Sequence, residues 1–155
     1  MCELCGDPYH TNPVDTAGSN SSTSQDSVAK PTYTVDQVAT YLTQGYWEDT
    51  GRSQRSYDVE PGGQITVNLN GLNAHGQATA RQALDSWTAI TGIEFVQSSS
   101  AQMTFDDSQS GAYASSSVSG DTVISTNINV ATSWANYGDY YLQTFIHEIG
   151  HALGL

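Results

Sequence analysis

The apolar stretch from Tyr140 to Leu155 constrains the fold more than any other segment. Its apolar side chains recur at helical spacing, which predicts an α-helix with one buried face. They are Leu142, Phe145, Ile146, Ile149 and Leu153. The same stretch contains two histidines and a glutamate, which are costly to bury without a partner. We therefore expect a packed helix whose polar side chains meet a ligand.

The spacing of the two histidines predicts a metal site. His147 and His151 are four residues apart, so both imidazoles lie on one helix face within reach of one cation. Neutral imidazole is a preferred zinc ligand. Glu148 can hold a zinc-bound water and take its proton as the water attacks a carbonyl, which is the chemistry of peptide hydrolysis. So short a pattern also occurs by chance, but the apolar context, Gly150 and the helix-ending Gly154 favour the functional interpretation.

The pattern from Pro31 onward predicts an α+β fold. A helix capped by Thr34 is expected to stop at Gly45, and a longer helix capped by Asn73 to end at Gly92. Strands are expected at 64–69, 93–96, 102–105, 112–116 and 122–130, where residues alternate or are rich in β-branched types. This order predicts a twisted mixed sheet with a backing helix and the C-terminal helix packed against it.

Residues 1–30 differ in composition from residues 31–155. Ser, Thr, Gly and Asn dominate from Thr16 to Ser27, which predicts a disordered leader or a pro-segment. The globular part is expected at 31–155. Cys2 and Cys5 with His10 could form half a zinc site or belong to a leader without chemistry, whereas neither flank has the strand and helix that a redox pair needs.

Charge and hydropathy exclude several partners. The formal net charge is −12, and only four residues are cationic: Lys30, Arg52, Arg55 and Arg81. Binding of nucleic acid needs clustered positive charge, and an anionic membrane would repel this surface. The chain has neither a membrane-spanning apolar run nor an N-terminal signal peptide. We therefore expect neither nucleic acid nor a membrane as partner.

The segment from His147 to Leu155 resembles the start of the metzincin signature H-E-x-x-H-x-x-G-x-x-H. Within the metzincins, the chain most resembles the serralysin group of bacterial secreted metalloproteases, over about residues 31–155. Further similar segments are Gly45–Trp47, Ala80–Trp87, Gly111–Ala114, Ile128–Val130 leading to Trp134, and Gln143–Ile146.

This resemblance implies a metzincin-like N-terminal subdomain of a secreted, monomeric zinc metalloendopeptidase that cuts protein or peptide substrates. It implies that His147 and His151 ligate Zn²⁺ and that Glu148 is the general base. It also implies an edge strand against which an extended substrate lies by strand addition, formed by Ala112, Tyr113 and Ala114. An ordinary edge strand is an equal alternative for these three residues.

The sequence departs from the serralysin pattern after Leu155. The third metzincin histidine would fall two residues later, and the methionine turn, the nearby tyrosine, the calcium-binding repeats and the C-terminal export signal are absent. We therefore expect an N-terminal fragment, with the third zinc ligand and any Ca²⁺ sites in the missing C-terminal region. Because catalytic zinc usually takes three protein ligands, the fragment alone should bind zinc weakly and be inactive.

Alternative functions remain open. A non-catalytic, protein-binding metzincin-like domain would keep the fold but gain nothing from an intact Glu148. A metalloenzyme of another superfamily would use a distant glutamate, although the position of Gly154 favours a metzincin. Cys5-Gly6-Asp7-Pro8 resembles the cysteine-switch segment of matrix metalloprotease propeptides, which implies a thiolate on the zinc. The other polar candidates are expected at the surface, in turns or in packing: His75, Asp106, Asp107, Asp121, Tyr140 and Tyr141.

Overall fold

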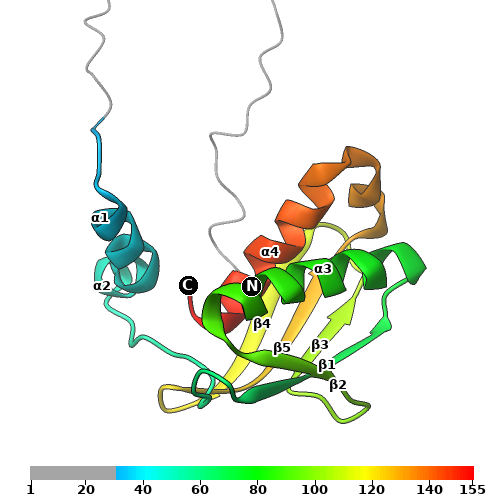
Figure 1. Cartoon of the computed structure of the whole chain (residues 1–155), viewed down its shortest axis with the longest axis horizontal. Helices are drawn as coiled ribbons and strands as arrows, with labels where there is room; N and C mark the ends of the chain where they lie inside the picture. The colour runs from blue at the N-terminus through cyan, green and yellow to red at the C-terminus, as the bar shows by residue number, and fades with distance from the viewer. Residues whose placement is uncertain (1–30) are drawn as a thin grey trace, which may run out of the picture.

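The computed structural model describes residues 31–155, which form a five-stranded mixed sheet with two long helices on one face (Figure 1). The α+β prediction is therefore confirmed. The predicted leader, with Cys2, Cys5 and His10, lies outside the described residues.

The helices are α1 (Val35–Thr40), α2 (Tyr46–Thr50), α3 (Ala74–Thr91) and α4 (Asp139–Leu153). A π-helical turn, η2 (Tyr41–Gly45), joins α1 to α2, and a 3-10 turn, η3 (Thr132–Tyr137), precedes α4. The strands are β1 (Gln64–Gly71), β2 (Glu94–Gln97), β3 (Met103–Asp106), β4 (Ala112–Ser119) and β5 (Thr122–Val130).

The sheet has the order β2-β1-β3-β5-β4. Each neighbouring pair is parallel except β4 and β5, which are antiparallel. The short segment that begins at Ala112 was predicted as an edge strand, and β4 does lie at the edge of the sheet. It extends further than predicted, to Ser119, because it pairs with β5 along its whole length.

The core lies between the sheet and the pair α3 and α4. Alternation along β1 buries Ile65, Val67 and Leu69 on one face. Phe105 of β3 meets Phe145 of α4 with ring centroids 6.3 Å apart. These contacts fix α4 over the centre of the sheet, and α4 is the helix that carries the two histidines.

Predicted helix ends hold at four positions. Thr34 caps α1 by accepting the Gln37 N–H at 3.2 Å. Asn73 caps α3 by accepting the Gly76 N–H at 2.9 Å, and Gly92 ends that helix with a φ of 71°. Gly154 ends α4 with a φ of 103°. Left-handed backbone of this kind is accessible mainly to glycine.

The prediction that Gly45 stops the first helix is wrong. Gly45 has a right-handed helical backbone, and the chain continues through α2 to Gly51, whose φ of 63° provides the left-handed cap. The ring of Tyr41 lies so close to Gly45 that a Cβ there would overlap it. The Tyr41 ring thus occupies the space that a side chain at position 45 would need.

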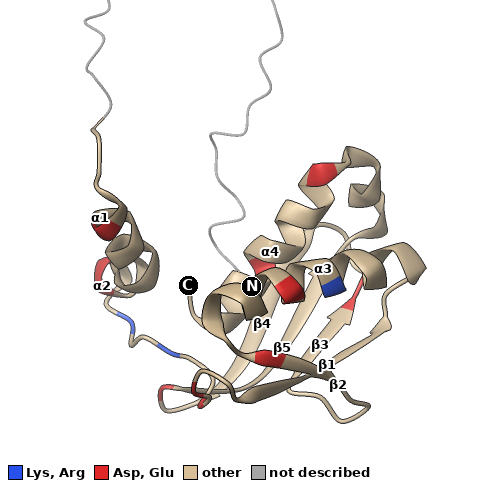
Figure 2. Cartoon of the chain, in the orientation of Figure 1, with Lys and Arg blue, Asp and Glu red and all other residues tan. Residues whose placement is uncertain are grey.

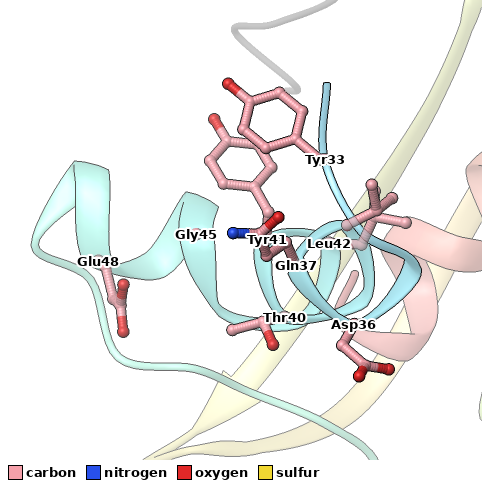
Figure 3. Close-up of a pocket in the computed structure, with 9 residues that line it drawn as sticks. Tyr33, Asp36, Gln37, Thr40, Tyr41, Leu42, Gly45 and Glu48 are labelled. Atoms are coloured by element: carbon pink, nitrogen blue, oxygen red, sulfur yellow. The ribbon is translucent and has the colours of Figure 1, made fainter. Parts of the chain in front are cut away.

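The helices α1 and α2 stand apart from the sheet (Figure 1). A cavity of about 710 Å³ lies along α1 and η2, with the rings of Tyr33 and Tyr41 beside it (Figure 3). None of the residues predicted for the metal or substrate site lines this cavity.

Within residues 31–155, no helix is long and apolar enough to span a membrane. Figure 2 places the Lys and Arg residues of this part of the chain in the loop after α2 and on α3, whereas Asp and Glu residues lie on all four α-helices and in several loops. Within residues 31–155, the three positive residues are Arg52, Arg55 and Arg81.

Candidate metal centre

The side chains of His147 and His151 meet on one face of α4. Their Nε2 atoms are 2.9 Å apart, and their rings are steeply inclined at 82°. Residues four apart on a helix are neighbours, so this local geometry follows directly from the sequence. Two imidazole nitrogens that converge in this way can bind one cation together.

The other ring nitrogen of His151 is also engaged. Its Nδ1 lies 2.9 Å from the backbone oxygen of Leu155. A hydrogen bond at this nitrogen fixes the orientation of the ring and leaves Nε2 for a ligand. Burial, and then the charge of His151, lower the pKa of His147, which favours the neutral imidazole that a metal needs.

Glu148 is almost fully buried, with 2% of its surface exposed. Its carboxylate accepts a hydrogen bond from the backbone N–H of Ala114, while its Oε2 has no partner among residues 31–155. Burial raises the pKa of Glu148, although the charge of His151 and the Ala114 N–H both act to lower it. An unpartnered buried oxygen is costly, and its place beside two converging imidazoles fits a metal and water site.

The three residues predicted to bind substrate begin β4. Ala112, Tyr113 and Ala114 are half-buried, and β4 packs against α4 as well as β5. The Gly111 carbonyl accepts the Ala131 N–H at 3.0 Å, so residues 111, 113 and 115 direct their backbone groups toward β5. The backbone groups of Ala112, Ala114 and Ser116 therefore point away from β5, and that of Ala114 reaches Glu148.

Other polar candidates do not join this site. Asn73 donates to Asp107 at 2.8 Å, Ser108 and Asn127 donate to Asp106, and the backbone of Asp121 accepts from Ser56. His75 lies against the ring of Tyr141 on α4. Among the described residues, no three His, Cys, Asp or Glu side chains form a group that could hold a metal ion.

Two tryptophans missed by the sequence interpretation contact α4 on either side of the histidine pair. Trp87 donates its indole N–H to the carbonyl of Ile146 at 3.0 Å, and Trp47 donates to the carbonyl of Gly154 at 3.2 Å. Apolar spacing indicated only that Trp87 faces the core. No local pattern could reveal the contact of Trp47, since 107 residues separate it from Gly154.

Comparison with known proteins identifies two relatives. One, from Pseudomonas marginalis, is named metallopeptidase AprA and is 29% identical over an alignment that covers 81% of this chain and 32% of the relative. The other, from Pseudomonas entomophila (strain L48), is named metalloprotease AprA and is 31% identical over 81% of this chain and 31% of the relative. The chain thus spans about a third of the length of these curated relatives. No family model matches the chain.

Solved structures with similar folds include myroilysin, with a TM-score of 0.49 and 24% identity over 63% of this chain and 46% of that chain. High choriolytic enzyme 1, a hatching enzyme zinc-protease from Oryzias latipes, matches with a TM-score of 0.45 and 22% identity over 59% of this chain and 44% of that chain. The sequence comparison confirms the resemblance inferred from the histidine segment. The chain is similar to the two metalloproteases named AprA over four fifths of its own length.

Proposed function

We propose that this chain is part of a zinc-dependent metalloendopeptidase, with His147 and His151 as zinc ligands and Glu148 as general base. The observation that carries the proposal is the pair of Nε2 atoms 2.9 Å apart beside a buried carboxylate with one unpartnered oxygen. The AprA relatives, which are named as metalloproteases, support it.

The roles of the residues follow from their surroundings. Zinc, when bound, supplies Lewis acidity that polarises a carbonyl and makes a water molecule more acidic. Glu148 has a raised pKa, so its carboxylate is a better proton acceptor than an exposed glutamate. The Ala114 N–H holds one side of that carboxylate. The other oxygen stays available to take a proton from the attacking water and pass it to the departing amine.

The substrate, in this proposal, is a protein or peptide that lies extended along β4. The backbone groups of Ala112 and Ser116 and the carbonyl of Ala114 are directed away from β5 and can pair with such a strand. The Ala114 N–H is engaged by Glu148. Tyr113 directs its backbone toward β5, so it would contact a substrate through its side chain.

The third zinc ligand, we propose, lies beyond Leu155, because catalytic zinc usually takes three protein ligands. The two histidines are the part of the ligand set that these residues contribute. We further propose that the complete enzyme acts outside the cell, as a monomer, and that residues 1–155 alone bind zinc weakly and have no peptidase activity.

The decisive experiment compares variants of the complete enzyme in zinc binding and peptide hydrolysis. His147→Ala or His151→Ala should abolish tight zinc binding, while His75→Ala on α3 serves as the matched control. Glu148→Gln should keep zinc but lower kcat by on the order of 100-fold or more, as expected when a general base is lost. Full activity of the Glu148→Gln variant would refute the assigned mechanism. Absence of peptide hydrolysis by the unsubstituted complete enzyme would instead favour a non-catalytic protein-binding domain.

A separate titration tests the ligand count. Residues 1–155 are titrated with zinc against a competing chelator, and weak binding is expected. Tight, stoichiometric binding would show that these residues supply a complete ligand set, which contradicts the proposal of an outside ligand.

A further inference from the structure

Two indole N–H groups donate hydrogen bonds to backbone carbonyls that lie, in the sequence, before and after the histidine pair of α4. Trp87 donates to Ile146, the residue before His147, and Trp47 donates to Gly154, three residues after His151. The hydrogen bond from Trp47 is buried, and only 7% of that side chain is exposed. Trp47 belongs to α2, which otherwise stands apart from the sheet (Figure 1).

The segment that carries Trp47 is fixed against the end of α4 by further contacts. The guanidinium of Arg55 lies over the Trp47 ring, 5.3 Å from its centroid. The Arg55 carbonyl approaches Gly154 so closely that a Cβ at that position would overlap it. The next residue, Ser56, joins the sheet by accepting the Val123 N–H at 2.8 Å. The loop after α2 therefore connects the sheet to the turn that ends α4.

That turn reaches the histidine ring directly. The Gly154 N–H donates to the His151 carbonyl at 3.2 Å, and the Leu155 N–H donates to the Gly150 carbonyl at 3.0 Å. The Leu155 oxygen in turn lies 2.9 Å from Nδ1 of His151. A chain of hydrogen bonds thus runs from the Trp47 indole through the turn to the imidazole that we propose as a zinc ligand.

We propose that Trp47 is a positioning residue for the metal centre, which it serves by holding the turn at Gly154 and, through Leu155, the ring of His151. This inference rests on the proposed function for the identity of the metal. The hydrogen bonds that it describes join residues of this chain, so they can be measured separately in the metal-free protein. Groups that orient a ligand from outside the coordination shell typically change metal affinity 10–100-fold.

The test uses Trp47→Phe, which keeps an aromatic ring and removes the N–H. In the metal-free protein, the Leu155 amide should exchange with solvent about tenfold faster, the size expected when one net hydrogen bond is lost. The ring resonances of His151 should also shift in NMR spectra. With zinc added, the dissociation constant should rise about tenfold.

Trp134→Phe is the matched control, because Trp134 stacks on Tyr140 at the start of α4 with ring centroids 5.7 Å apart. It should leave the Leu155 amide, the His151 ring and the zinc affinity unchanged. If Trp47→Phe folds poorly, Arg55→Ala loosens the same indole while retaining its N–H. It should then produce smaller changes in the same three measurements.

The outcomes separate the two proposals. A Trp47→Phe variant that is less stable but has an unchanged Leu155 amide and His151 ring would overturn the positioning role, leaving Trp47 as an anchor for α2. Absence of zinc binding by the unsubstituted complete enzyme would instead overturn the proposed function. The metal-free measurements would still decide the role of Trp47.

Discussion

Glu148 of α4 accepts a hydrogen bond from the backbone N–H of Ala114 on β4. The contact forms because alternate residues of β4 turn their backbone groups away from β5, and Ala114 is one of them. The proposed general base is therefore held by the proposed substrate strand. Any shift of β4 against β5 by one residue would exchange the inward and outward groups and remove this amide from the carboxylate.

The burial of Glu148 predicts that this residue costs stability. Replacing it by glutamine removes a buried charge, while the side-chain carbonyl can still accept from Ala114. We expect Glu148→Gln to raise the free energy of unfolding by about 1 kcal/mol at pH 7, the order of the cost of an unsatisfied buried polar group. Urea unfolding of the metal-free protein, with a chelator present, measures this change.

The stability gained through Glu148→Gln should increase with pH. Burial raises the pKa of Glu148 in the folded state, so its contribution to stability is present at low pH and lost as the pH rises through the folded pKa. The gain from Glu148→Gln should thus be larger at pH 7 than at pH 4. Glu94→Gln, at an exposed position on β2, should change little at either pH. A destabilised Glu148→Gln variant would contradict this prediction.

The orientation of β4 predicts different effects of proline at adjacent positions. Ser115 directs its N–H toward Asn127 on β5, whereas Ser116 directs its N–H away from the sheet. Proline is tolerated in strands where the missing N–H faces outward. Ser115→Pro should lower the free energy of unfolding by at least about 1 kcal/mol more than Ser116→Pro, as measured by urea unfolding.

The Ser116→Pro variant also tests whether β4 binds the substrate. In the complete enzyme, Ser116→Pro should raise KM for peptides, since it removes an outward donor. Ser116→Ala controls for the loss of the side-chain contact with Thr126, which spans 3.0 Å. Equal destabilisation by Ser115→Pro and Ser116→Pro would show that the assignment of which β4 N–H groups face β5 is wrong.

The fold could be predicted where local signals and burial agree. The bounds of β5 coincide with the predicted range of 122–130, because β-branched residues and full burial of its C-terminal part select the same segment. Gly45 shows where prediction from local sequence signals fails. A glycine that caps a helix and a glycine that makes room for a ring look alike in sequence, and only the position of Tyr41 decides between them.

Some features of the site could likewise be predicted from the sequence, and others could not. The meeting of His147 and His151 follows from helix periodicity, so four-residue spacing sufficed to predict it. The contact between Ala114 and Glu148 depends on the strand register and on where α4 packs, and neither is encoded locally. The role of the three-residue segment from Ala112 as a substrate strand stays a prediction, although its edge position is confirmed.

Tyr57 predicts a loss of stability at alkaline pH. Its hydroxyl donates to Thr126 at 2.8 Å in the core, and burial raises its pKa above the ordinary value of 10.0, although the hydrogen bond with Thr126 opposes this shift. A raised folded pKa stabilises the protein below pH 10, and that contribution is lost as the pH rises through the folded pKa. The urea midpoint should therefore fall above pH 10.

Two variants isolate the contribution of Tyr57. Tyr57→Phe should weaken the dependence of the urea midpoint on pH above 10, whatever its effect at neutral pH. Tyr137→Phe, at a position with 67% exposure, should leave the dependence as it is. An unaltered alkaline slope in Tyr57→Phe would assign the loss to other groups, among which Tyr141 also has a pKa raised by burial and by the charge of Asp107.

Gly154 is constrained twice, and substitution can separate the two constraints. Its φ of 103° disfavours any side chain, and a Cβ would also overlap the Arg55 carbonyl. Gly120, in the turn between β4 and β5, has a φ of 61° with open space around it, so Gly120→Ala should cost only the backbone penalty of about 1 kcal/mol. Gly154→Ala should lower the free energy of unfolding by at least about 2 kcal/mol, because overpacking adds to that penalty. Equal losses in urea unfolding would mean that Arg55 moves aside freely, and the loop after α2 would then not fix the end of α4.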